Sequence, residues 1–560
     1  MTQPEADSHA DGPVEGHAGT HAVSVAQRHG VDTMFTLSGA HVFPLYDAAV
    51  HAHPPLRLLD VRHEQTAVFA AEGLAKLTRR PGLAVVTAGP GVTNSVSAVT
   101  TAHFNGSPVV VIGGRAPEYR WGQGALQELD HPPLLAPVTK WATTIRHPEA
   151  VPEQVDQAFA LATTAHRGPV FLDIGMDQLY SRAEVTLPEP AAPARRPPDP
   201  DDVAEVARLL AQAERPVVVL GGDVWMDDAV DAARRLVVTL GLPVIANGMG
   251  RGIVDPASGH LVTRARSRAF GAADLVVVVG SPLDFRLGYG RFGGKDGALP
   301  AAVVHLVDAP EQVARHVDLA ASAAGDLTAT LDGVRAAWEQ EIRHHDVTAW
   351  RSDLRDAASA ARAADLGLLT SPADPIHPAR IYGELGPRLA DDAIVIGDGG
   401  DFVSFAGRFV EPARPGRWMD PGPFGCLGTG LGYAIAARLT DPSAQVVALL
   451  GDGAAGFSLM DVDTLVRHQL PVVMVMGNNG VWGLEKHPMN FLYGYDVVAD
   501  LAPGTRYDEV VRALGGDGET VTRADEVGPA LDRAFASDVP YLVNVLTDPA
   551  IAYPRSTTGV

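Results

Sequence analysis

Residues 446–479 read VVALLGDGAAGFSLMDVDTLVRHQLPVVMVMGNN, and this stretch decides the fold. It contains two short apolar runs, 446–450 and 471–477, separated by a segment long enough to form a helix. Apolar runs of strand length that alternate with helical segments are typical of buried parallel strands joined by crossover helices. The stretch therefore predicts one strand–helix–strand unit of an α/β domain.

Both apolar runs end in residues suited to a charged ligand. Gly451-Asp452-Gly453 follows the first run and Asn478-Asn479 follows the second. In an α/β sheet, ligands bind at the carboxyl ends of strands, where loop amides and helix N-termini are exposed. Glycine lets the backbone approach a phosphate closely, while carboxylate and amide oxygens suit Mg²⁺. We therefore expect a phosphate and metal site here; a common Asp-Gly turn beside an unrelated asparagine pair is the alternative.

Two proline-rich segments, 187–200 and 366–378, divide the chain into three blocks. Such segments favour extended linkers because proline blocks helix formation. Each block alternates apolar runs with amphipathic segments, so the predicted fold class is α/β, with three doubly wound parallel-sheet domains in series. The expected boundaries are a disordered tail over 1–20, a first domain over 21–186, a central, nucleotide-binding-like domain over 201–345, a linker over 346–378 and a third domain over 379–560.

Charge and composition restrict the expected partners. The chain of 560 residues has a formal net charge of −23, which disfavours nucleic acid and anionic membrane surfaces as partners. It has one cysteine, Cys426, and no apolar run long enough to span a bilayer, as is typical of a cytoplasmic protein. His9 and His17 lie in the expected tail and His21 directly follows it; we interpret all three as solvated rather than as metal ligands.

The segment from Gly451 to Asn479 resembles the thiamine-diphosphate (ThDP) signature, which begins Gly-Asp-Gly and closes Asn-Asn. It is most similar to the acetolactate synthase and 2-hydroxyacyl-CoA lyase group, and more distantly to benzaldehyde lyase. The resemblance implies ThDP and Mg²⁺ as cofactors, held by a third, diphosphate-binding domain. It assigns the Mg²⁺ ligands to Asp452, Asn479 and the carbonyl of Val481, and it places Gly451, Gly453 and Ala454 at the diphosphate.

The same resemblance assigns the first block to the pyrimidine of the cofactor. Glu64, in Arg62-His63-Glu64-Gln65, stands where the family has the glutamate that activates the aminopyrimidine. The turn that contains Pro90 and Asn94 resembles the family's Gly-Pro-Gly-x-Thr-Asn turn near that ring. A surface helix start, where the dipole favours glutamate anyway, is the alternative for Glu64.

Two segments of the third block complete the expected cofactor site. In Gly425-Cys426-Leu427, the carbonyl of Gly425 would bind the 4′-amine, and Leu427 would be the bulky residue that bends the cofactor. A buried helix start is the alternative there. The segment Gly399, Gly400, Asp401 and Phe402 resembles a second diphosphate loop, although it lacks the Gln-His of acetolactate synthases.

Residues of the substrate site are expected in two segments of the first block. His41, in Ser38-Gly39-Ala40-His41, resembles the benzaldehyde lyase pattern and could relay protons; a structural histidine is the alternative. Gln127 matches the active-site glutamine of the Phe-Gln-Glu motif of acetolactate synthases, with Leu126 in place of the phenylalanine.

The segment after the expected metal ligands distinguishes an acetolactate synthase from a 2-hydroxyacyl-CoA lyase. Trp482, Leu484 and Glu485 stand where acetolactate synthases carry Gln-Trp-Gln, and Glu485 resembles the acid/base glutamate of actinobacterial 2-hydroxyacyl-CoA lyases. Leu126 and Leu484 would then line a small acyl pocket. An ordinary Glu-Lys surface pair is the alternative. Arg286 instead matches an arginine that acetolactate synthases place near the substrate carboxylate, which supports the synthase.

We therefore predict a lyase that cleaves a short 2-hydroxyacyl-CoA to formyl-CoA and a ketone or aldehyde, reversibly. An acetolactate synthase that acts on pyruvate is the first alternative, so the substrate is an acyl-CoA or a 2-keto acid. A non-catalytic paralogue subunit is the second, disfavoured because Glu64, Asp452 and Asn479 are all present. The resemblance also implies a homodimer or homotetramer with active sites between subunits. Whether the central domain binds ADP, the CoA nucleotide, FAD or nothing is left open.

Overall fold

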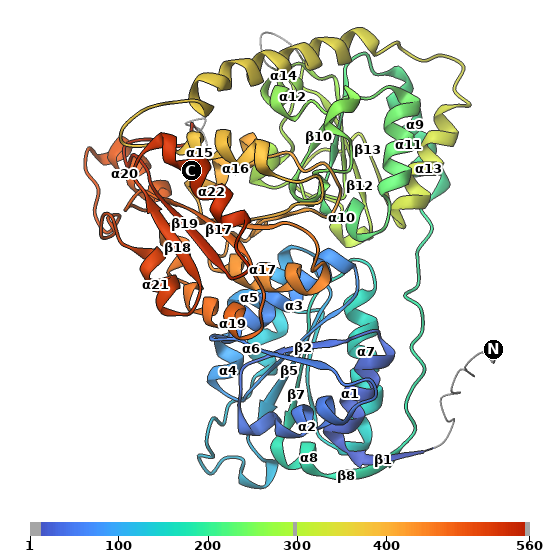
Figure 1. Cartoon of the computed structure of the whole chain (residues 1–560). Coiled ribbons are helices and arrows are strands. Elements are labelled where there is room, and N and C mark those ends of the chain that lie inside the picture. The colour runs from blue at the N-terminus through green and yellow to red at the C-terminus, as the bar shows by residue number, and fades with distance from the viewer. Residues whose placement is uncertain (1–12, 295–298, 555–560) are drawn as a thin grey trace, which may run out of the picture. The chain divides into compact units, whose positions relative to one another are not determined.

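The structure, a computed structural model, describes residues 13–294 and 299–554. Within these residues it contains three parallel sheets and one two-stranded antiparallel ribbon. The first compact unit ends at Pro193 and holds the first parallel sheet, while the second begins at Ala194, also takes in Lys76–Arg79 and Phe104–Gly106, and holds the other two. The three α/β domains predicted from the sequence are confirmed (Figure 1).

The first parallel sheet lies between residues 33 and 175. Its strands are β2 (Thr33–Thr36), β3 (Arg57–Asp60), β4 (Gly82–Val86), β5 (Val109–Arg115), β6 (Trp141–Ile145) and β7 (Val170–Gly175), and its main helices are α1 (Ala18–Arg28), α2 (Phe43–His51), α3 (Glu64–Thr78), α4 (Pro90–Thr93), α5 (Val96–Phe104) and α7 (Val151–Thr163). The strand order is β3-β2-β4-β5-β7-β6. Apolar residues of α1, α2 and α7 form one core with alternate strand residues. The strand residues between them are buried too, so both faces of the sheet are covered.

The central sheet has the strand order β10-β9-β11-β12-β13. Its strands are β9 (Pro216–Leu220), β10 (Val244–Ala246), β11 (Leu275–Val279), β12 (Ala302–Val307) and β13 (Ala321–Ala324), and its main helices are α9 (Pro200–Gln212), α10 (Gly222–Met226), α11 (Val230–Leu240), α12 (Arg266–Ala272), α13 (Leu327–Trp338) and α14 (Thr348–Leu369). Helices α9, α11 and α13 share a core with one face of the sheet, and α12 and α14 share a core with the other.

The third sheet contains the quoted stretch and has the order β15-β14-β16-β17-β19-β18. Its strands are β14 (Ile394–Asp398), β15 (Trp418–Met419), β16 (Val446–Gly451), β17 (Val473–Asn478), β18 (Asp517–Val521) and β19 (Tyr541–Leu546), and its helices are α15 (Pro378–Leu385), α16 (Asp401–Phe409), α17 (Thr429–Thr440), α18 (Asp452–Ala455), α19 (Val462–Arg467), α20 (Gly483–Tyr493), α21 (Tyr507–Ala513) and α22 (Val527–Phe535). Strands β16 and β17 are adjacent and parallel, which confirms the predicted strand–helix–strand unit.

The tail expected over 1–20 differs from the structure where the two can be compared. Residues 1–12, with His9, lie outside the described part of the chain. Strand β1 (Val14–His17) pairs with β8 (Arg182–Val185), and α1 follows directly. His17 caps α1 by accepting the N–H of Thr20 at 3.0 Å, and buried His21 contacts the carbonyl of Ala183 at 3.1 Å. The expectation of solvated histidines is therefore wrong for both, because small apolar residues give α1 a buried face that average composition conceals.

The linker expected over 346–378 is mostly a helix. α14 spans 22 residues, and Trp350, Leu354 and Ala358 on it pack into the core of the central domain. Trp350 also donates a hydrogen bond to the carbonyl of Pro216 at 3.0 Å. The helix therefore belongs to the central domain, and the helical spacing of its apolar residues outweighs the prolines that follow it. Residues 186–199, by contrast, contain no helix or strand. No helix of the described residues combines the length and apolar character needed to cross a membrane.

Candidate functional site

Three neighbouring strands of the third domain end at one edge of its sheet. β14, β16 and β17 are adjacent and parallel, and the register pairs Asp398 with Leu450 and Gly451 with Gly477. The loops that follow these strands therefore emerge side by side at the carboxyl edge, where α/β sheets bind ligands. The register confirms the convergence that the sequence spacing predicts.

Asp452 begins α18 at this edge and is buried, with a relative exposure of 4%. Its Oδ2 accepts a hydrogen bond from the backbone N–H of Gly480 at 2.8 Å, so the loops after β16 and β17 touch. Burial raises the pKa of Asp452 from its ordinary 3.8 to about 6, because the charged carboxylate loses hydration. A cation beside the carboxylate would restore the preference for the charged form.

Two further oxygen donors lie on the loop that Asp452 contacts. Asn479 Oδ1 accepts a hydrogen bond from the N–H of Val481 at 3.1 Å, which closes a tight turn, and Val481 is buried. A carboxylate, a carboxamide and a backbone carbonyl are hard oxygen donors of the kind that Mg²⁺ takes. The donor set of Asp452, Asn479 and Val481 therefore fits a small divalent cation.

Glycines allow the loops of this edge to pack closely. A Cβ on Gly453 would lie 2.5 Å from the Trp482 ring, and one on Gly400 would lie 2.5 Å from Leu484 Cδ1. Gly399 has a φ of +131°, which residues with side chains rarely adopt. Trp482 and Leu484, at the start of α20, therefore pack directly on the glycine loops that follow β16 and β14.

Asp401 and Phe402, expected at the cofactor, make structural contacts. The Asp401 carboxylate accepts the N–H of Tyr553 at 2.9 and 3.1 Å. The Phe402 ring packs against Gly477, where a Cβ would lie 2.4 Å away. Both side chains thus brace the sheet edge, and a contact with the diphosphate stays a prediction for the loop.

Asp398 is a site residue that the sequence reasoning missed. It is fully buried at the end of β14, and its two carboxylate oxygens accept the N–H groups of Gly428 and Gly430 at 3.0 and 2.9 Å. Burial raises its pKa to about 6. Asp398 thereby fixes the start of α17, and with it the preceding segment of Gly425 and Leu427. A carboxylate that ends an apolar strand before two glycines is the signal that could have found it.

In the first unit, the structure brings Glu64 and Asn94 together. Glu64 is the first residue of α3, has a relative exposure of 7% and accepts a hydrogen bond from Asn94 Nδ2 at 3.0 Å. The surface-helix alternative for Glu64 is therefore wrong. Pro90 opens α4, which carries the turn that ends at Asn94. A buried carboxylate held by a carboxamide can form a directed hydrogen bond with a basic ring nitrogen.

His41 and Gln127 both contact residues of the turn before α4. His41 is buried, and its Nδ1 lies 3.2 Å from the hydroxyl of Thr87. Burial lowers the pKa of His41 below its usual value. Gln127 has a φ of +61° and packs on Gly89, where a Cβ would lie 2.9 Å from its Cβ. Leu126 beside it is 78% exposed.

His131 and Asp173, which the sequence reasoning also missed, support the turn before α4. The Gly89 N–H donates to His131 Nε2 at 3.0 Å, and His131 Nδ1 lies 2.9 Å from Asp173 Oδ2. Both side chains are fully buried, and Arg115 Nη1 donates to the same carboxylate oxygen at 3.2 Å. Because His131 Nε2 accepts a hydrogen bond, Nδ1 carries the ring proton and donates a hydrogen bond to Asp173. No local pattern marks His131, because its partners are distant in the sequence.

Glu485 has a different environment from the one a Glu-Lys surface pair would give. It is exposed in the first turn of α20, with no side-chain hydrogen bond or ion pair to any residue within 13–294 or 299–554. Its neighbour Lys486 binds Asp496 at 3.1 Å and also Asp500. The Glu485–Lys486 ion pair of the alternative is therefore absent from the described residues, and an acid/base role for Glu485 stays a prediction.

Arg286 has a carboxylate partner of its own. Its Nε and Nη2 donate to Asp284 Oδ2 at 3.0 and 2.8 Å. Both residues lie in the loop after β11 of the central domain, and Asp284 Oδ1 also accepts the backbone N–H of Arg286 at 2.9 Å. The positive charge of Arg286 is thus largely matched within its own loop.

The sequence matches three domains of one enzyme family in the order of the three sheets. Residues 17–134 match the N-terminal TPP binding domain of thiamine pyrophosphate enzymes, residues 203–334 the central domain and residues 398–545 the C-terminal TPP binding domain. Thiamine pyrophosphate is another name for ThDP. The last match contains Asp452 and Asn479, and the first contains Glu64.

Full-length relatives agree with these matches. The chain is 50% identical over 547 residues to "Acetolactate synthase large subunit IlvG" of Mycobacterium tuberculosis, covering 96% of this chain and 97% of that protein. It is 32% identical over 576 residues to "2-hydroxyacyl-CoA lyase 2" of Caenorhabditis elegans, covering 95% and 89%. The human protein of that name is 32% identical over 562 residues, covering 91% and 86%. The chain belongs to the thiamine-pyrophosphate-dependent enzymes, in the group that contains acetolactate synthases and 2-hydroxyacyl-CoA lyases.

Proposed function

We propose that this ThDP-dependent enzyme cleaves a short 2-hydroxyacyl-CoA to formyl-CoA and a ketone or aldehyde, and that it joins these products in reverse. The observation that carries the proposal is Glu485, an exposed carboxylate without a partner in the described chain. It stands directly after Leu484, which packs on the glycine loop at Gly400. A carboxylate in this place is suited to move a proton on a bound substrate.

The cofactor is expected to bind along the carboxyl edge of the third sheet. Asp452, Asn479 and the carbonyl of Val481 would hold Mg²⁺, which neutralises the diphosphate. Glu64, oriented by Asn94, would hold the aminopyrimidine and favour the tautomer that can take a proton. When bound, ThDP supplies a nucleophilic carbon and an electron sink for the bond that breaks.

The roles of Glu485 in cleavage can be written as two proton transfers. Glu485 first takes the proton of the substrate hydroxyl, so that the bond between the carbinol carbon and the thioester carbonyl carbon breaks and a ketone or aldehyde leaves. The electron pair stays with the carbonyl carbon. Glu485 then returns its proton to that carbon, which gives formyl-CoA. We expect Leu126, Leu484 and Trp482 to shape a small acyl pocket, with His41 and Gln127 as further polar groups.

An acetolactate synthase is the second candidate, and the 50% identical relative of M. tuberculosis carries that name. A synthase would act on pyruvate, whose carboxylate needs a cation. Arg286 is the residue expected for that role, but two of its three guanidinium nitrogens, Nε and Nη2, already donate to Asp284. The pairing of Arg286 with Asp284 is the observation that supports the lyase at this point. The second candidate also predicts a bound yellow flavin, whereas the first accommodates ADP or the CoA nucleotide in the central domain.

A substrate panel read by mass spectrometry separates the candidates. The purified protein, with ThDP and Mg²⁺, is given short 2-hydroxyacyl-CoA thioesters, among them 2-hydroxyisobutyryl-CoA, and in parallel pyruvate. The proposal expects formyl-CoA from at least one thioester. It fails if every thioester is recovered intact while pyruvate is converted to acetolactate.

A further inference from the structure

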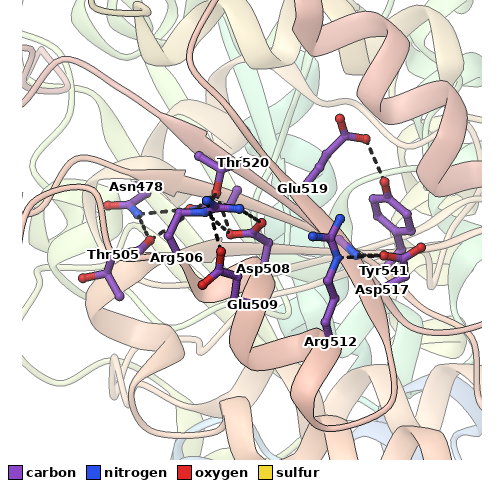
Figure 2. Close-up of polar contacts among 12 residues, drawn as sticks. Asn478, Thr505, Arg506, Asp508, Glu509, Arg512, Asp517, Glu519, Thr520 and Tyr541 are labelled. Carbon is purple, nitrogen blue, oxygen red and sulfur yellow. Dashed lines mark hydrogen bonds and ion pairs between the residues drawn. The ribbon is translucent and has the colours of Figure 1, made fainter.

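A chain of polar side chains, all buried except the half-buried Thr520, connects α21 to the end of β17 (Figure 2). Asp508 of α21 accepts the hydroxyl of Thr520 at 2.6 Å, and Thr520 on β18 faces Asn544 on β19 at 2.9 Å. Asn544 Oδ1 in turn accepts Asn478 Nδ2 at 3.0 Å. Asp508 and Asn544 are fully buried, and Asn478 is 2% exposed.

Asp508 sets the direction of every hydrogen bond in this chain. Burial opposes its ionisation, but hydrogen bonds from Arg506 and Thr520 keep the pKa of Asp508 below its ordinary value. An ionised carboxylate only accepts, so the Thr520 hydroxyl must donate to it. The Thr520 oxygen is then left to accept from Asn544 Nδ2, which leaves Asn544 Oδ1 to accept from Asn478.

The chain therefore fixes which way the Asn478 carboxamide points. Its Nδ2 donates to Asn544 Oδ1 and to the carbonyl of Thr505, at 3.0 and 3.1 Å. Its Oδ1 consequently points away from these acceptors, and it is buried without a hydrogen-bond partner in the described residues. Asn478 ends β17 and directly precedes Asn479, an expected cation ligand.

The same chain holds the segment that braces the ligand loop. Asn544 Nδ2 donates to the carbonyl of Thr505 at 3.1 Å, as Asn478 does. Just before Thr505, the backbone of this segment pairs with the ligand loop. Leu501 N donates to Gly480 O at 2.7 Å, and Trp482 N donates to Ala499 O at 2.8 Å. Loop 479–481 is thus attached to the polar chain at its start, through Asn478, and along its length, through residues 499–505.

We propose that Asp508, Thr520 and Asn544 act as positioning residues for the divalent-cation site, although none of them is a ligand. Their hydrogen bonds hold loop 479–481 in its ligand geometry before the cation arrives, which lowers the cost of binding. The proposal rests on the cation site of the proposed function and is independent of the substrate. A purely structural role would change stability and leave the cation affinity unaltered.

The test compares Thr520→Val with Thr520→Ser. Valine keeps the shape and removes the hydroxyl, while serine keeps the hydroxyl. Mg²⁺ is titrated into each protein at saturating ThDP by isothermal titration calorimetry, a readout that needs no turnover. Thr520→Val is expected to weaken Mg²⁺ binding about tenfold or more, as removal of groups that orient metal ligands does. Thr520→Ser is expected to stay within about twofold of the wild type.

Thr330→Val is the matched control. Thr330 is a fully buried threonine of α13 in the central domain, and its hydroxyl donates to the carbonyl of Asp326 at 2.8 Å. The Thr330→Val variant should have a lower melting temperature than the wild type and an unchanged Mg²⁺ affinity. Asn544→Ala, which breaks the chain but keeps the contact of Thr520 with Asp508, should weaken Mg²⁺ binding like Thr520→Val, and it replaces that variant if Thr520→Val does not fold.

Two results would overturn the positioning role. If Thr520→Val and Asn544→Ala fold, bind Mg²⁺ like the wild type and only melt earlier, the chain is structural. If the wild type itself shows no Mg²⁺-dependent ThDP binding, the cation site of the proposed function fails, and the positioning role fails with it. The first result leaves the proposed function intact, so the two failures are distinguishable.

Discussion

At the scale of single residues, the candidate site of the third domain contains two buried carboxylates. Asp452 and Asp398 are both buried, and burial raises the pKa of each to about 6. A buried carboxylate is costly unless hydrogen bonds or a cation compensate it. Backbone N–H groups donate to both carboxylates, but Asp452 also contacts the loop that carries the oxygen donors of Asn479 and Val481. This difference suits Asp398 to a structural role and Asp452 to a cation.

Asp452→Ala should abolish stabilisation of the protein by Mg²⁺ and ThDP. The variant loses the charged ligand, so binding should weaken about 100-fold or more. The cofactor-free variant should be at least as stable as the wild type, because a costly buried charge is gone. Thermal unfolding with and without both cofactors measures this. Asp525→Ala, at an exposed residue paired with Arg523, is the control. An Asp452→Ala variant that the cofactors stabilise as they do the wild type would contradict the site.

We expect Asp398 to make the stability of the cofactor-free protein depend on pH. Its pKa is raised from 3.8 to about 6 in the folded state, so the folded protein binds this proton more tightly than the unfolded chain. The stabilisation is present at low pH and is lost as the pH rises through about 6. Between pH 5 and 7, this group should lower the free energy of unfolding by about 1 kcal/mol.

Urea unfolding of Asp398→Asn and the wild type at several pH values isolates that contribution. Other titrating groups are common to both proteins, so the wild type should lose about 1 kcal/mol more than the variant between pH 5 and 7. Parallel curves for the two proteins would mean that Asp398 titrates in the folded state as it does in the unfolded chain.

Site residues can be predicted from the sequence when they belong to a local motif. Asp452 and Asn479 stand in a motif, and Glu64 opens a recognisable helix. Asp398 ends an apolar strand before two glycines, a local signal that the prediction overlooked. His131 escapes such reasoning because its partners, Gly89 and Asp173, each lie 42 residues away in the sequence.

At the scale of elements, the proposed chemistry depends on the start of α20. Glu485→Gln removes the proton acceptor while keeping the size of the side chain. Because the carboxylate is exposed and unpaired within the described chain, the change should leave folding and ThDP binding intact. It should lower kcat about 100-fold or more. Glu526→Gln, at an exposed glutamate beside Arg523, is the control for a lost surface charge. Wild-type kcat in Glu485→Gln would exclude Glu485 as the proton carrier.

Elements were predictable where apolar spacing is regular. Strands β16 and β17 follow the apolar runs 446–450 and 471–477, and the expected ranges agree with them. Strands β13 (ASAA) and β18 (DGETV) lack such runs and were not expected. The two misjudged segments, β1 with α1 and the helix α14, are rich in alanine and polar residues. Their burial comes from tertiary packing, which overall composition does not reveal.

At the scale of the whole molecule, we expect each active site to combine Glu64 of one subunit with Asp452 of another. Two inactive variants, Glu64→Gln and Asp452→Ala, test this when they are co-refolded. A mixed dimer then has one site with both residues intact. Random pairing should restore about a quarter of wild-type activity. Size-exclusion chromatography with light scattering gives the oligomeric state. No recovered activity in verified mixed dimers would place both residues in sites within one subunit.

The most direct test of the proposed lyase activity is a reaction in which the two candidate substrates compete for the enzyme. Enzyme with ThDP and Mg²⁺ receives 2-hydroxyisobutyryl-CoA and pyruvate at equal concentration, and the products are followed by mass spectrometry. The proposed lyase predicts formyl-CoA and acetone in equal amounts, at a rate that falls about 100-fold or more in Glu485→Gln. Accumulation of acetolactate and CO₂, with the thioester untouched, would contradict it.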